Sequence, residues 1–184
     1  MKYISAGHCN TQGPNYDPGA SGINKRYEAK ETMLLRDAVI NELKRRGCTD
    51  IIHDLDDENR NQYFSRIKTN KTDVVVEFHF NAGEPSATGT EALISVDADK
   101  LDLAMANDFA TNSSLILGIK NRGVKSETDT RFKRLGLMRE SGIVVLVETC
   151  FITNMNDMAA YDKNFQRLVA CYSEIIIRYD SLIV

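Results

Sequence analysis

Short apolar runs alternate along the chain with longer segments in which apolar residues recur every three or four positions. The short runs predict buried strands, and the recurring spacing predicts helices that bury one face. One such helical stripe consists of Met33, Leu34, Ala38, Val39 and Leu43. Over the whole chain these patterns predict strands at residues 2–6, 51–53, 73–80, 90–96 and 143–149, and helices at residues 28–46, 59–68, 100–117 and 165–179.

The order of these elements indicates the fold class. Strands that alternate with helices favour an α/β fold built on a largely parallel sheet. The run at residues 143–149 is apolar at almost every position, as expected for a central strand that is covered on both faces. We therefore predict a single-domain, three-layer αβα fold with a twisted, mostly parallel central sheet over residues 1–184.

The composition and charge of the chain disfavour some classes of binding partner. Apolar residues at 42% and charged residues at 27% are typical of a folded, soluble domain. The net charge of −3 disfavours nucleic acid as a partner, and the basic run at residues 44–46 is explained by its place at a predicted helix end. The first residues do not resemble a signal peptide, and the sequence has no apolar run of about 20 residues. We therefore expect a cytoplasmic location in the producing cell and no stable membrane association.

Four residues with reactive side chains fall at the ends of predicted elements. His8 follows the first strand, Glu28 begins the first long helix, His79 ends the third strand, and Glu148 ends the apolar strand at residues 143–149. Because the carboxyl ends of parallel strands meet at one edge of a sheet, we expect these side chains to converge. Two histidines and one carboxylate with an open fourth position form a catalytic zinc set, and a second carboxylate nearby is suited to move a proton.

Each of these residues also has an ordinary structural explanation. His8 is also explained as a loop histidine, Glu28 as an acidic residue in a first helical turn, and His79 as a core histidine between two phenylalanines. Glu148 is harder to explain in this way, because a carboxylate at the end of an apolar strand is costly without a partner. Burial there raises the pKa of a carboxylate. The spacing of the four residues alone leaves both explanations open.

The motifs around these residues, taken together, resemble the zinc amidases of the Amidase_3 type, the catalytic domain of bacterial cell-wall amidases and phage endolysins. The similarity runs from about residue 2 to residue 178. The matching segments are Gly7-His8, Asp17-Pro18-Gly19-Ala20, Glu28 in a helix that ends at Gly47, His79-Phe80-Asn81-Ala82, Gly89-Thr90-Glu91, the strand that ends at Glu148, and Phe151-Ile152-Thr153-Asn154.

The resemblance implies that His8, Glu28 and His79 bind Zn²⁺ and that Glu148 is the catalytic acid/base. It implies hydrolysis of the amide bond between N-acetylmuramic acid and L-alanine in bacterial peptidoglycan. With no export signal in the sequence, a monomeric endolysin is expected, which acts on the glycan and stem peptide of the wall after release and so lyses the cell. Two alternatives are a zinc peptidase that cleaves another amide of the stem peptide and a non-catalytic wall-binding domain.

Several positions differ from the family pattern or add to it. The loop after His8 is longer and contains fewer glycines. Glu77 stands where the family often has a small residue, and serves either as a partner of His79 or in an ion pair. Asn81 either orients His79, touches substrate or shapes the turn. The basic loop at residues 131–134 either binds carboxylates of the peptide or is a solvated surface loop.

The cysteines provide a further alternative. None of the four forms a C-x-x-C pair, and a chain of this length does not need disulfides, so we expect free thiols. Cys9 is adjacent to His8, so its thiolate is an alternative zinc ligand to be weighed against the histidine–glutamate–histidine set. Cys150 lies two residues beyond Glu148, so strand alternation places both side chains on one face. A thiol hydrolase that uses Cys9 or Cys150 with a histidine is therefore the rival of a zinc enzyme.

Overall fold

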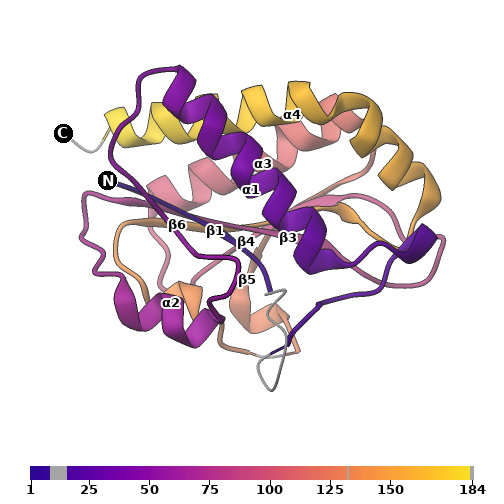
Figure 1. Cartoon of the computed structure of the whole chain (residues 1–184), viewed down its shortest axis with the longest axis horizontal. Coiled ribbons are helices and arrows are strands. Elements are labelled where there is room, and N and C mark those ends of the chain that lie inside the picture. Colours follow the sequence, from indigo (N-terminus) through magenta and orange to yellow (C-terminus); the bar gives the residue numbers. More distant parts are fainter. Residues whose placement is uncertain (9–15, 132, 183–184) are drawn as a thin grey trace.

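The computed structural model describes residues 1–8, 16–131 and 133–182. These residues form one six-stranded sheet with helices on both faces (Figure 1). The elements, with η for 3₁₀ helices, are β1 (Lys2–Ala6), η1 (Ile23–Lys25), α1 (Glu28–Arg45), β2 (Ile51–His53), α2 (Arg60–Arg66), β3 (Val74–Asn81), β4 (Thr90–Ile94), α3 (Lys100–Leu117), β5 (Asn121–Ser126), η2 (Glu127–Asp129), η3 (Leu137–Arg139), β6 (Ile143–Phe151) and α4 (Met155–Ser181). No helix within these ranges is long and apolar enough to cross a membrane.

The strands follow the order β2-β1-β3-β6-β4-β5 across the sheet. Strands β2, β1, β3 and β6 run parallel to one another, whereas β4 pairs antiparallel with β6 and parallel with β5. The predicted α/β class with a mostly parallel sheet is confirmed. β3 and β6 lie at the centre, and nearly all of their residues are buried because helices or turns cover both faces.

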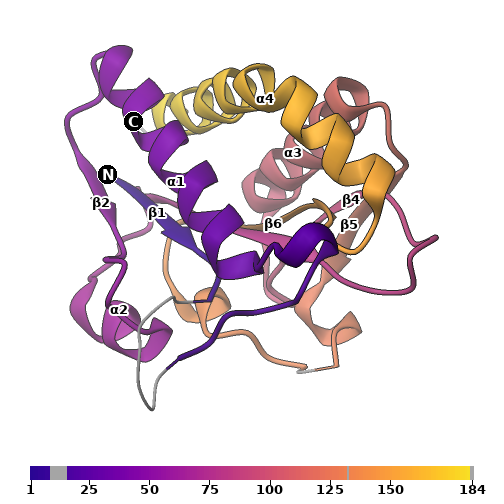
Figure 2. The same cartoon turned by 45° about the vertical axis from the view of Figure 1, so that its right-hand side comes forward.

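The two faces of the sheet are covered unevenly. Helices α1, α3 and α4 pack on one face over the larger apolar core (Figure 2). The other face carries α2 and η3, where Tyr63 and Leu137 pack against Val75 and Leu146. Along β3 and β6 this second face changes from apolar residues to polar ones before the strands end. The polar stretch is where the reactive residues lie.

The last helix begins ten residues earlier than the predicted residue 165. The Asn154 side chain caps it by accepting hydrogen bonds from the backbone nitrogens of Asn156 and Asp157, at 2.8 and 3.0 Å. The same side chain donates to two carbonyl oxygens in the turn at residues 85–87. Asn154, the last residue of the family motif, therefore ties the end of the β6 segment to that turn.

Strand β5 is absent from the prediction. Its sequence is polar apart from Val124, and it lies at the edge of the sheet with β4 as its only partner strand among the described residues. An edge strand with little apolar burial shows no apolar alternation, so the pattern along the chain does not reveal it.

Candidate metal and catalytic site

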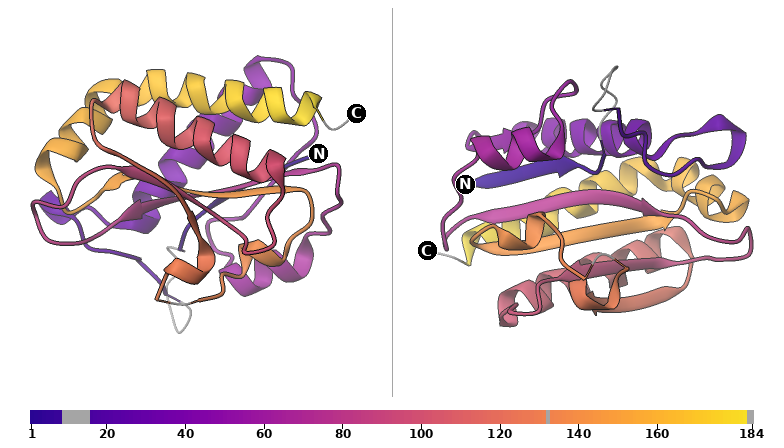
Figure 3. Two further views of the ribbon diagram at one scale, coloured as in Figure 1. Left: turned by 180° about the vertical axis from the view of Figure 1, so that it is seen from behind. Right: turned by 90° about the horizontal axis from the view of Figure 1, so that it is seen from below.

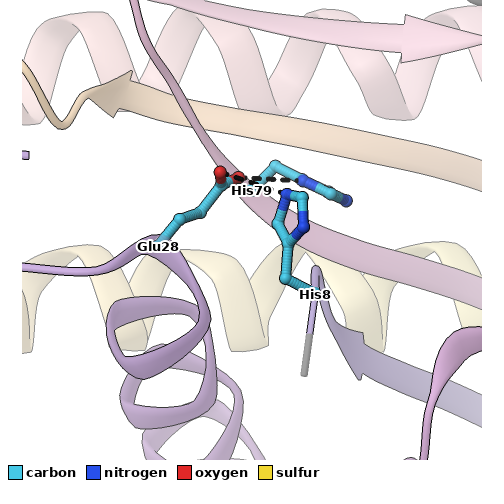
Figure 4. A group of neighbouring side chains, drawn as sticks. All are labelled: His8, Glu28 and His79. Carbon is cyan, nitrogen blue, oxygen red and sulfur yellow. Dashed lines mark hydrogen bonds and ion pairs between the residues drawn. The ribbon is translucent and has the colours of Figure 1, made fainter. Parts of the chain in front are cut away.

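His8, Glu28 and His79 meet on the face of the sheet that carries α2, near the carboxyl ends of β1 and β3. His8 lies two residues after β1, Glu28 is the first residue of α1, and His79 belongs to β3. Their side chains point toward one another (Figure 4). The Glu28 carboxylate places Oε2 3.1 Å from His8 Nε2 and Oε1 3.0 Å from His79 Nδ1. The predicted convergence of these three residues is found, and their role as metal ligands remains a prediction.

The Glu28 carboxylate is held in place by the backbone as well as by the histidines. Oε2 accepts a hydrogen bond from the backbone nitrogen of Ala20, and Oε1 accepts one from the backbone nitrogen of Phe80, each at 3.0 Å. Burial alone would raise the pKa of Glu28, but hydrogen bonds with His79 and His8 outweigh it and hold the pKa well below its usual range. Glu28 is therefore an ionised acceptor at neutral pH.

His8 is oriented by Asp17, whose part in the site the sequence did not reveal. Nδ1 of His8 donates to Asp17 Oδ2 at 2.9 Å, which leaves Nε2 directed at Glu28. A carboxylate on the outer nitrogen of an imidazole fixes the tautomer that a metal ligand needs. The backbone of His8 has a φ of 69°, a left-handed conformation that is uncommon for histidine. Cys9 and most of the loop that follows lie outside the described residues.

Gly7 and Gly19 are required because the reactive side chains pack directly on the backbone at these positions. A Cβ atom on Gly7 would overlap the ring of His79. A Cβ atom on Gly19 would lie 2.7 Å from both Glu28 Oε2 and His8 Cδ2. The Gly-His and Asp-Pro-Gly-Ala motifs of the sequence therefore have a steric origin in the packing of this cluster.

Replacing Gly7 by alanine is expected to displace His79 and weaken zinc binding by about 100-fold or more. The His79 ring cannot withdraw, since it is 7% exposed and hydrogen-bonded on both nitrogens. Competition with a chromophoric chelator measures the affinity. Gly47→Ala is the matched control, because that glycine has a φ of 90° but no atom within 4 Å of the added Cβ. Wild-type affinity in Gly7→Ala would contradict the packing argument.

Glu77 contacts His79 and also forms an ion pair, so both predicted alternatives are present. Its Oε1 lies 2.9 Å from His79 Nε2 and 3.5 Å from the guanidinium of Arg60, and Ser5 Oγ donates to Oε2. Burial alone would lower the pKa of His79, but hydrogen bonds with Glu28 and Glu77 raise it to about 10. Two carboxylates therefore flank the imidazole and favour positive charge at this position. No sequence signal indicates Arg60.

Glu148 lies next to the cluster on the neighbouring strand. Register pairs it with His79 of β3 and with Glu91 of β4, so the three side chains project from one face in a row across β3, β6 and β4. Its Oε2 is buried and has no hydrogen-bond partner among the described residues. Burial raises the pKa of Glu148 to about 7. A carboxyl group without a partner, and with a pKa near neutrality, is suited to accept and release a proton.

The prediction that Cys150 shares a face with Glu148 is wrong. Between the pairs His79–Glu148 and Asn81–Phe151, β6 contains one residue more than β3. This β-bulge turns Cys150 to the opposite face, where it is fully buried in the larger core with its sulfur 3.8 Å from that of Met158. Burial also raises the pKa of the Cys150 thiol well above its ordinary value, which disfavours a thiolate nucleophile.

Two other predicted positions have different outcomes. Asn81 donates from Nδ2 to Glu91 Oε1 at 2.9 Å, so its described contact is with Glu91. In the basic loop, Lys133 donates to the carbonyl oxygen of Thr128, and Arg134 is exposed. The peptide-binding loop and the solvated loop both remain predictions.

The donor set fits a zinc ion. Tetrahedral ligands at zinc–ligand distances of about 2.0–2.1 Å lie roughly 3.4 Å from one another. The two histidine–carboxylate contacts of 3.0 and 3.1 Å are close to that spacing, and one ligand atom from each of His8, Glu28 and His79 lies within 4.8 Å of the others. Imidazole nitrogen and carboxylate oxygen are donors that zinc accepts, and three protein ligands leave one position for a substrate or water.

The fold and this site define the chain as an α/β protein with a histidine–glutamate–histidine cluster on its sheet. A family model described as N-acetylmuramoyl-L-alanine amidase (Amidase_3) matches residues 3–177. The chain belongs to this family.

A relative in Bacillus subtilis (strain 168), the uncharacterized protein YqiI, is 30% identical over 158 residues, which cover 84% of this chain and 71% of the relative. Among solved structures, the catalytic domain of the CD27L endolysin targeting Clostridia difficile is 20% identical with a TM-score of 0.76, and the match covers 96% of each chain. The catalytic domain of CwlV, an N-acetylmuramoyl-L-alanine amidase from Bacillus (Paenibacillus) polymyxa var. colistinus, is 22% identical with a TM-score of 0.72 over 97% of this chain and 98% of that one. At these identities the two structures establish the shared fold.

Proposed function

We propose that this protein is a zinc-dependent N-acetylmuramoyl-L-alanine amidase that hydrolyses the amide bond between N-acetylmuramic acid and L-alanine in peptidoglycan. The observation that carries the proposal is the His8–Glu28–His79 cluster beside Glu148, whose buried Oε2 has no partner among the described residues. The family to which the chain belongs supports the same bond. His8, Glu28 and His79 hold the zinc ion, and Glu148 is the catalytic residue.

Each residue of the site has a separate role in the proposed reaction. When bound, zinc supplies a Lewis acid that polarises the scissile carbonyl. The Glu148 carboxylate takes a proton from the attacking water and passes it to the amide nitrogen as the carbon–nitrogen bond breaks. Asp17 and Glu77 hold the rings of His8 and His79, so the three ligands keep their positions while charge develops. The products are the lactyl carboxylate on the glycan and a stem peptide with a free L-alanine amine.

Mass spectrometry of purified peptidoglycan after digestion tests both the bond and the metal. We expect intact glycan strands and free stem peptides that begin at L-alanine. A chelator should stop their release, and added zinc should restore it. The reason is that the proposed reaction requires the ion that the three side chains hold. Heat-inactivated protein is the control for contaminating activities.

Other outcomes of this digestion would change the proposed function. Cleavage inside the stem peptide would keep the zinc site but make the enzyme a peptidase. Absence of cleavage on every wall type would favour a non-catalytic wall-binding domain, and chelator-resistant cleavage would point to a thiol. We further propose that the activity serves cell lysis, so suspended walls or permeabilised cells should lose turbidity at the same zinc dependence.

A further inference from the structure

The row of side chains that begins with His79 of the cluster continues to two cations on the edge strand. His79, Glu148 and Glu91 follow one another across β3, β6 and β4 on one face. The next strand, β5, contributes Arg122, whose Nε lies 2.7 Å from Glu91 Oε2, and Lys125, whose Nζ lies 2.6 Å from the same oxygen. The four strands lie side by side when the sheet is seen from below (Figure 3, right).

A bulge in β5 brings both cations to Glu91. Residues three apart on a regular strand point to opposite faces. Between the pairs Thr90–Asn121 and Ala92–Val124, β5 contains one residue more than β4, and Gly123 within this stretch has a φ of 82°. Glycine adopts this left-handed conformation without strain, so the bulge is built into the sequence. The irregularity therefore places two positive charges at one point beside the catalytic row.

The charges at this point do not balance. Glu91 is 7% exposed and needs a positive partner, which one cation would provide. It has two, and it also accepts a hydrogen bond from Asn81. The guanidinium of Arg122 packs over the Phe151 ring, and its two terminal nitrogens have no acceptor among the described residues. Arg122 and Lys125 are about one third exposed, at 30% and 35% of their side chains, so the surplus positive charge reaches solvent.

The spacing from Glu148 to these cations matches a short piece of stem peptide. Adjacent strands lie about 4.8 Å apart, so the backbone of β5 is roughly 10 Å from β6. The charged ends of Arg122 and Lys125 extend back to Glu91 Oε2 on β4, so they lie roughly 5–10 Å from Glu148. An extended peptide advances about 3.3 Å per residue, and a charged hydrogen bond adds about 3 Å. A carboxylate on the second residue after the scissile amide therefore reaches the cations. In stem peptides this residue is a glutamate joined through its γ-carboxyl group, so its α-carboxylate is free unless it is amidated.

We propose that Arg122 and Lys125 form a subsite that binds the α-carboxylate of the second residue of the stem peptide and so favours peptidoglycan in which this carboxylate is not amidated. This inference rests on the proposed amidase function and names a specificity of the same site. Glu91 is the positioning residue that holds both cations at the end of the row.

Kinetics on two matched substrates test the subsite. The zinc-loaded protein is given N-acetylmuramoyl-L-alanyl-γ-D-glutamyl-L-lysine with either an α-carboxylate or an α-carboxamide on the glutamyl residue. We expect kcat/KM to be about tenfold higher for the carboxylate, mostly through KM, as for one charge-assisted contact that is partly exposed. Lys125→Gln should reduce this ratio to near one, and Glu91 keeps Arg122 as its partner in that variant. Lys120→Gln, an exposed lysine before the same strand, should keep the ratio.

A binding measurement separates failure of the subsite from failure of the amidase. Calorimetry compares the free tripeptides L-alanyl-γ-D-glutamyl-L-lysine with the acid or the amide at the same carbon. We expect the acid to bind about tenfold more tightly than the amide, and Lys125→Gln to abolish this difference. This result supports the subsite even if neither substrate is cleaved. Absence of cleavage would overturn only the amidase function. Equal kinetics or equal binding of acid and amide by the wild-type protein would overturn the subsite, as would loss of the preference in Lys120→Gln.

Discussion

Glu148→Gln is expected to lower kcat for the amide substrate by about 10³-fold, within the roughly 10²–10⁴-fold effect of a positioned acid or base. Glutamine keeps the shape of the side chain but neither accepts nor releases the proton. Because Oε2 has no hydrogen-bond partner among the described residues, the substitution breaks no contact of that oxygen. Turnover is measured by the release of L-alanine amino termini from purified walls.

A measurement of zinc affinity shows whether Glu148→Gln loses activity through the proton transfer or through loss of the metal. Glu148 is not part of the three-residue cluster, so we expect its glutamine variant to bind zinc as the wild type does. Glu174→Gln, an exposed change on α4, is the control for substitution at a site without function. More than a tenth of wild-type kcat in Glu148→Gln would remove Glu148 from the mechanism and leave the proton transfer to another group.

The strands that build the site are predictable from sequence because they are buried on both faces. β3 and β6 begin with runs of apolar residues, and the polar residues that follow near their carboxyl ends are conspicuous. This is why His79 and Glu148 are recognised from the sequence. β5 is buried much less and carries Arg122 and Lys125, so it provides no comparable signal.

The contacts that tune the site are less accessible to sequence reasoning. The contact of Glu77 with Arg60 depends on where α2 packs against the sheet, and no local pattern records that packing. The position of Cys150 follows from one extra residue in β6, which simple alternation cannot anticipate. The sequence marks Gly7 only as part of a motif, whereas its physical reason is the His79 ring on the neighbouring strand.

The sequence predicts a site at the carboxyl edge of the sheet, whereas the reactive side chains also lie on one face of the sheet. Glu28 is the first residue of α1 and contacts His79 Nδ1, so its carboxylate reaches the face that carries α2. That face has fewer helices than the other, and the polar ends of β3 and β6 are therefore not covered by a long helix. The uneven layers therefore leave the reactive residues on the face with less helical cover.

Glu28→Gln is expected to lower zinc affinity by about 100- to 1000-fold, because one of the three proposed protein ligands is lost. The substitution should also lower the stability of the zinc-free protein. The two carboxylate oxygens accept hydrogen bonds from Ala20 and Phe80, and an amide nitrogen cannot replace an acceptor. One backbone donor is left unsatisfied in this buried position, which costs about 1–3 kcal/mol of unfolding free energy.

Thermal unfolding with and without zinc distinguishes this variant from Glu148→Gln. A ligand that binds only the folded state raises Tm in proportion to the logarithm of its concentration over Kd. The zinc-induced rise should persist in Glu148→Gln and should nearly vanish in Glu28→Gln at the same zinc concentration. Glu42→Gln on the same helix removes only surface ion pairs and should keep the rise. A full zinc shift in Glu28→Gln would mean that the ion binds elsewhere, and the function of the cluster would then have to be reassigned.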